Sequence, residues 1–92
     1  MSTSVVPTIE VPELEPAPIV KRSVVVAGHR TSISIEEPFW RAAKDLAVAD
    51  GVSMSSLLAE IDRNRPPGAS LSSAVRLHVL RRYQEAAARI PR

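Results

Sequence analysis

The sequence predicts a small, mainly α-helical domain with one short β-strand, which pairs with the same strand of a second protomer. Residues 29–35 alternate between apolar and polar side chains, as expected of a strand with one buried face. Apolar side chains then recur at helical spacing through residues 38–88. So short a strand needs a partner in water, and no second strand is obvious along the chain. We therefore expect the partner to come from another copy.

The composition limits the kinds of protein that the chain can be. Its 92 residues allow one domain, and the lack of cysteine excludes disulfides, thiolate metal sites and cysteine nucleophiles. We find neither an apolar run approaching the roughly 18 residues of a membrane span nor a signal peptide, so a cytoplasmic protein is expected. Of the formal net charge of +2, residues 1–20 contribute −3, which leaves +5 for residues 21–92. The net positive charge of residues 21–92 is suited to a polyanionic partner.

Residues 1–20 are predicted to be a disordered acidic tail, and residues 21–92 to be the folded domain. Four prolines within the tail are incompatible with a helix or a central strand. The tail is either a solubilising extension or a segment that competes with DNA or binds a protein partner. Residues 23–27 have strand propensity, and either extend the predicted strand or lead into it through Gly28.

The two faces of the predicted strand differ in chemistry. One face is suited to burial and consists of Thr31, Ile33 and Ile35. The other face consists of Arg30, Ser32 and Ser34. The guanidinium and hydroxyl groups of the second face can form hydrogen bonds with the edges of nucleic-acid bases.

Three helices are predicted after the strand. The first begins around Pro38, which fits the first turn of a helix, and ends at Gly51 in the left-handed conformation. Ser53 caps the second helix, and Pro66 stops it. The third helix covers about residues 71–88 and begins with the same glycine and serine pattern.

This order of strand, helix, glycine turn and serine-capped helix over residues 29–64 resembles the ribbon-helix-helix DNA-binding family of the Arc/MetJ class. The longer run from Lys21 to Ala74 also resembles a bacterial subfamily that carries an extra C-terminal helix. The resemblance implies a dimeric transcriptional regulator whose paired strands enter the major groove of duplex DNA. Base contacts would come from Arg30, Ser32 and Ser34, and repression would follow from occlusion of a promoter.

Two further groups of residues complete the predicted site. The free amides and the dipole at the start of the second helix suit a backbone phosphate, and the basic residues before the strand are within reach of others. The predicted backbone contacts are Lys21, Arg22, His29, Ser53, Met54 and Ser55. The predicted dimer core is Ile33, Ile35, Phe39, Leu46, Leu57, Leu58 and Ile61.

Two alternatives to this interpretation stay open. One is a protein-interaction module of the antitoxin or antiactivator type, acting through the third helix or the tail. The other is a helix-turn-helix protein that reads DNA through residues 70–84, with Arg76 and Arg81 as contacts.

His29 and His78 have no carboxylate at ligand spacing, and no nucleophile has a plausible general base. We therefore predict no metal site, no cofactor and no enzymatic activity.

Overall fold

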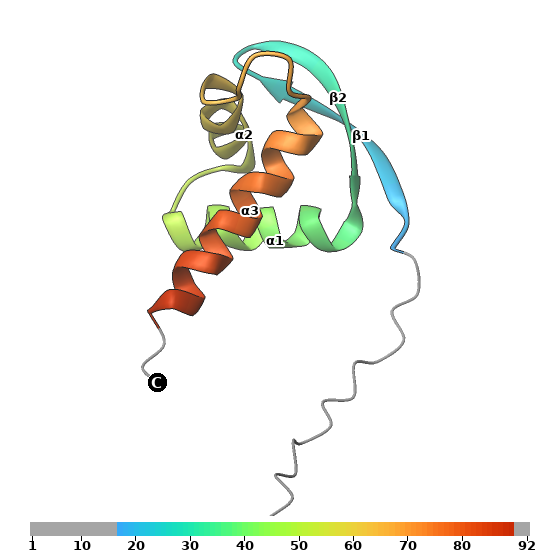
Figure 1. Ribbon diagram of the computed structural model, residues 1–92. Coiled ribbons are helices and arrows are strands. Elements are labelled where there is room, and N and C mark those ends of the chain that lie inside the picture. Colours follow the sequence, from blue (N-terminus) through green and yellow to red (C-terminus); the bar gives the residue numbers. More distant parts are fainter. Residues whose placement is uncertain (1–16, 90–92) are drawn as a thin grey trace, which may run out of the picture.

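A computed structural model describes residues 17–89, which form a two-stranded antiparallel sheet and three helices (Figure 1). The strands are β1 (Ile19–Val26) and β2 (His29–Glu36). The helices are α1 (Glu37–Asp50), α2 (Met54–Arg63) and α3 (Leu71–Ala88). The predicted mainly helical domain with a third C-terminal helix is confirmed.

The two strands form a hairpin within one chain. The register runs from Ile19 opposite Glu36 to Val26 opposite His29. Ala27 and Gly28 close the hairpin with φ angles of 51° and 80°, and two positive φ values are typical of a type I′ turn. The prediction that β2 finds no partner strand in its own chain is therefore wrong. Pairing of β2 with a second protomer stays a prediction.

The predicted tail reaches too far into the domain, because β1 begins at Ile19. The N–H of Glu37 donates to the carbonyl of Pro18 at 3.2 Å, which ties the start of β1 to the start of α1. Residues 1–16, which contain most of the predicted tail, lie outside the described residues.

Local signals in the sequence set the helix ends as predicted. Gly51 ends α1 with a φ of 69°, and the N–H of Val52 donates to the carbonyl of Ala47 at 3.0 Å. This is the Schellman arrangement, which a left-handed glycine makes possible. The hydroxyl of Ser53 accepts a hydrogen bond from the N–H of Ser56 at 3.1 Å, and so caps α2.

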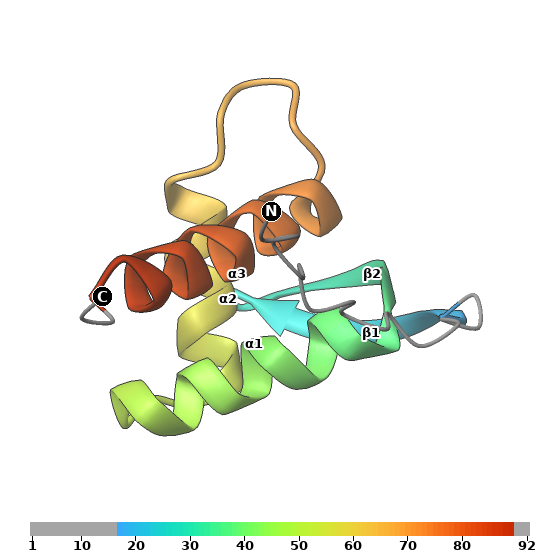
Figure 2. The ribbon, with the colours of Figure 1, turned by 60° about the horizontal axis from the view of Figure 1, so that its bottom comes forward.

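The helices cover one face of the hairpin and leave the other exposed (Figure 1). Figure 2 shows α2 crossing between α1 and α3. Five of the residues predicted for the dimer core are buried inside this single chain: Ile33, Ile35, Leu57, Leu58 and Ile61. The other two, Phe39 and Leu46, are partly buried against them. These residues thus form the core of one protomer, and their place in a dimer interface stays a prediction.

Candidate nucleic-acid interface

The exposed side of the hairpin, hereafter the outer face, is built from alternate residues of both strands. Strand β2 contributes Arg30, Ser32 and Ser34, and strand β1 contributes Ile19, Lys21, Ser23 and Val25; all seven are exposed. Across the ladder, Lys21 lies opposite Ser34, Ser23 opposite Ser32, and Val25 opposite Arg30. The outer face therefore has serine hydroxyls at its middle, a positive charge near each end, and two exposed apolar side chains, Ile19 and Val25.

All three residues predicted to read bases lie on the outer face, while their contact with DNA stays a prediction. Lys21 shares this face, as a neighbour of Ser34. Ser23 and Val25 were not among the site residues predicted from the sequence. The signal for them was a pair of strand-forming runs separated by the two residues Ala27 and Gly28.

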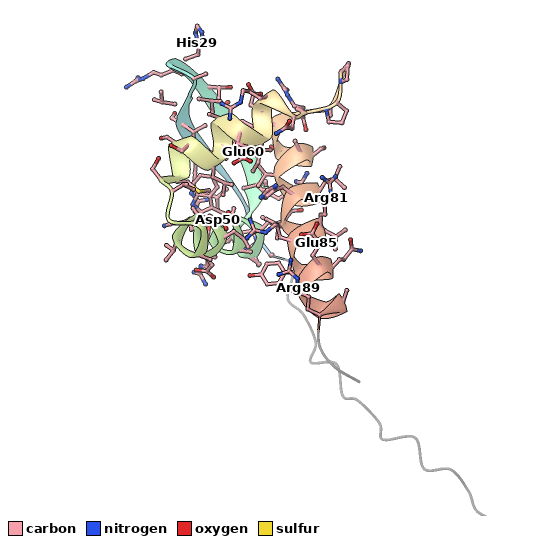
Figure 3. The ribbon with its side chains drawn as sticks, turned by 90° about the vertical axis from the view of Figure 1, so that its left-hand side faces the viewer. His29, Asp50, Glu60, Arg81, Glu85 and Arg89 are labelled. Carbon is pink, nitrogen blue, oxygen red and sulfur yellow. The ribbon has the colours of Figure 1, made fainter. Side chains whose placement is uncertain are left out.

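The cations of the outer face are not neutralised by any described residue. Across residues 17–89, neither Lys21 nor Arg30 takes part in an ion pair. His29 lies at the tip of the hairpin opposite Val26, where Figure 3 shows it apart from the helices. The positive charge of this surface is therefore available to an anionic ligand.

Arg22 lies on the opposite side of β1, and its surroundings are different. Its guanidinium pairs with the Glu37 carboxylate and lies 4.8 Å from the centre of the Trp40 ring. This hydrogen bond holds the pKa of Glu37 below its usual value. The phosphate contact predicted for Arg22 is at odds with this placement, because the side chain is already held against α1.

Arginines on α3 are also engaged within the chain. The Nε of Arg76 donates to Glu36 at 2.7 Å, and Arg82 binds both carboxylate oxygens of Asp50 at 2.7 and 2.8 Å. These hydrogen bonds lower the pKa of Glu36 and the pKa of Asp50. The pairing of Arg76 disfavours the helix-turn-helix alternative, in which this side chain contacts DNA.

The start of α2 offers the amides predicted to bind a phosphate. Ser53 is the cap residue, so the N–H groups of Met54 and Ser55 in the first turn have no carbonyl partner within the helix. Helix α2 ends near the hairpin turn, where Asp62 and His29 line the same shallow hollow. The start of α2 lies at the other end of the helix (Figure 1). The structure thus separates this predicted contact from the hairpin tip.

A groove of about 340 Å³ lies between α2 and α3, at a distance from the outer face. Figure 3 shows Glu60 on α2 and Arg81 and Glu85 on α3, so side chains of both signs line it. Burial lowers the pKa of His78, which lines the same groove, and its Nε2 has no hydrogen-bond partner among residues 17–89. The mixed charges identify no ligand for this groove.

Residues 17–89 lack two other kinds of functional element. No helix in this part of the chain is long and apolar enough to cross a membrane. The same residues contain no cluster of three or more histidine or acidic side chains able to hold a metal ion.

Comparison with known proteins agrees with this geometry. The model of the ribbon-helix-helix domain family matches residues 19–83, which span both strands, α1, α2 and most of α3. No match was found among curated proteins or among solved structures. Proteins of the matched family are generally DNA-binding transcription regulators, they usually dimerise, and their fold is not an enzymatic one. This chain belongs to the ribbon-helix-helix family.

Proposed function

We propose that this protein is a transcriptional regulator that inserts the hairpin of β1 and β2 into the major groove of duplex DNA. The observation that carries the proposal is the outer face, where Lys21 and Arg30 flank a cluster of serine hydroxyls and form no ion pair with any of residues 17–89. A cytoplasmic repressor that occludes a promoter is the regulator type that we favour.

The dimensions and the chemistry of the hairpin fit this role. A major groove about 12 Å wide admits a two-stranded ribbon. Arg30 can donate two hydrogen bonds to O6 and N7 of a guanine, whereas Ser32 and Ser34 bind either base type and discriminate less. We expect Lys21 and His29 to contact phosphates, and such contacts hold the ribbon in position without reading sequence.

The test is duplex binding by the full chain across a salt series. We expect a steep loss of affinity with salt, because phosphate contacts release counterions. The variant Arg30→Ala/Ser32→Ala/Ser34→Ala should lose its preference among sequences and roughly 10- to 100-fold in affinity for the preferred site. Arg81→Ala is the matched control on α3 and should bind like the wild type. No binding by the wild type at low salt would overturn the proposal, and loss of binding only in Arg81→Ala would favour helix-turn-helix recognition.

A second contact is proposed at the start of α2, where Ser53, Met54 and Ser55 surround a backbone phosphate. Helix α3 provides a close control, because Ser70 caps it with the same 3.1 Å bond that Ser53 makes in α2. Ser55→Glu and Ser72→Glu place a carboxylate at equivalent positions, where the helix dipole tolerates it. We expect Ser55→Glu to weaken DNA binding roughly tenfold by repelling a phosphate. If Ser55→Glu and Ser72→Glu weaken DNA binding equally, the start of α2 does not contact a phosphate.

We also propose that the protein acts as a homodimer. Three side chains on α3 leave about half of their surface exposed: Leu77 at 51%, Leu80 at 50% and Tyr83 at 49%. Their spacing places them on one side of the helix, where a second copy could cover them. Sedimentation equilibrium should show a dimer for the wild type and a monomer for Leu80→Glu. If the wild type is monomeric, the exposed side chains of α3 would instead contact a different protein, as the interaction-module alternative requires.

A further inference from the structure

The outer face of the hairpin is asymmetric, because two different strands of one chain form it. Among the cross-strand pairs of this face, only Ser23 and Ser32 are alike. Arg30 lies opposite Val25, and Ser34 lies opposite Lys21. A ribbon made from two identical strands would present the same side chains twice. This hairpin instead presents an apolar side chain beside its arginine.

We infer that β1 is a second reading strand, and that Val25 recognises a thymine methyl group beside the guanine bound by Arg30. This inference rests on the function proposed above and names the determinants of its sequence preference. Each hairpin would then read a sequence that is itself asymmetric, with different contacts from its two strands.

Val25 is suited to this contact by its position and its chemistry. It is 48% exposed at the turn end of the outer face, where it is the cross-strand neighbour of Arg30. Side chains directly opposite each other in an antiparallel pair have Cβ atoms roughly 5 Å apart, so the two can contact adjacent base pairs. Valine has no hydrogen-bonding group, and the C5 methyl of thymine is the apolar group that bases present in the major groove.

Lys21 lies on the same strand as Val25, farther from the hairpin turn. It lies four residues from Val25, which corresponds to roughly 13 Å at 3.3 Å per residue. That length matches about four base steps of 3.4 Å. Lys21 therefore holds the far end of the ribbon at a phosphate while Val25 and Arg30 contact bases.

The experiment begins with selection of preferred duplexes from a random library by the full wild-type chain. Each thymine of the selected site is then replaced by deoxyuridine, which removes only the methyl group. We expect one replacement to weaken wild-type binding about fourfold, as burial of a single methyl group implies. The same replacement should leave the affinity of Val25→Ser unchanged, while substitution of the adjacent guanine should still weaken it.

The control variant is Ser23→Ala, which alters a neighbouring outer-face residue of β1 and should keep the full response to deoxyuridine. Circular dichroism melting verifies that both variants fold. The inference is overturned if no deoxyuridine replacement weakens wild-type binding, or if Val25→Ser responds as strongly as the wild type. Either result leaves DNA binding through β2 intact. Failure of the wild type to bind any duplex at low salt overturns the proposed function together with this inference.

Discussion

The two faces of the hairpin put the same residue type to different uses. Arg22 on the inner side pairs with Glu37 and stacks on Trp40, whereas Arg30 on the outer face is exposed and has no ion pair within residues 17–89. Which face of the pleat a residue occupies, rather than its type, decides whether its charge is available to a ligand. A count of basic residues therefore overstates the surface that can bind DNA.

The largest expected contrast is between two adjacent residues of β2. Ile33 is 1% exposed in the core, while Ser32 faces solvent. Ile33→Ala should lower the free energy of unfolding by about 2–5 kcal/mol, because it removes buried contacts and leaves a cavity. Ser32→Ala should change it by less than about 0.5 kcal/mol. Urea denaturation followed by circular dichroism measures both, and similar losses would refute the assignment of the two faces.

The two arginines give the next contrast. Arg22→Ala removes the stacking on Trp40 and should lower the free energy of unfolding by about 1–2 kcal/mol. Arg30→Ala should leave stability nearly unchanged and weaken DNA binding roughly tenfold or more. Denaturation and fluorescence anisotropy on the same two proteins make the comparison. If the Arg22→Ala protein is fully stable but fails to bind DNA, Arg22 contacts a DNA phosphate as the sequence predicted.

A smaller effect tests whether the hairpin itself forms in solution. Ala27 has a φ of 51°, a left-handed conformation that costs alanine more than asparagine. Ala27→Asn creates the Asn-Gly pair preferred in type I′ turns and should raise the free energy of unfolding by roughly 0.5–1 kcal/mol. Ser70→Asn, a change between two good capping residues outside the hairpin, should have little effect. No gain from Ala27→Asn would indicate that β2 takes its partner strand from another chain.

The helices were predictable because their limits depend on neighbouring residues. Gly51 and Ser53 lie next to the helix ends that they set, so their signals can be read from a few positions. The hairpin was missed for two reasons. Three consecutive valines, Val24–Val26, hide the alternation of β1, and alanine at position 27 is an unusual residue for the turn.

The placement of the charged residues was the least predictable part of the candidate site. Arg76 and Glu36 are 40 residues apart in sequence, yet they share a hydrogen bond. The side of β1 that Arg22 occupies depends on the register with β2 and on which face the helices cover. Neither follows from local patterns, because both are consequences of tertiary packing.

The pH dependence of stability gives the last and smallest test of the contrast between the faces. Arg76 and Arg22 hold the pKa values of Glu36 and Glu37 below their usual value of about 4.3 in the folded protein. The unfolded chain therefore takes up protons first as the pH falls through that value, and the stability that the ionised carboxylates contribute is lost. Glu36→Gln/Glu37→Gln should flatten this decline in melting temperature, whereas Arg30→Ala should leave it as steep as in the wild type. His78 causes a separate decline that begins near pH 6.5, because burial lowers its pKa, and both variants should retain it. If Arg30→Ala flattened the acidic decline, the outer face would hold an ion pair that the structure does not show.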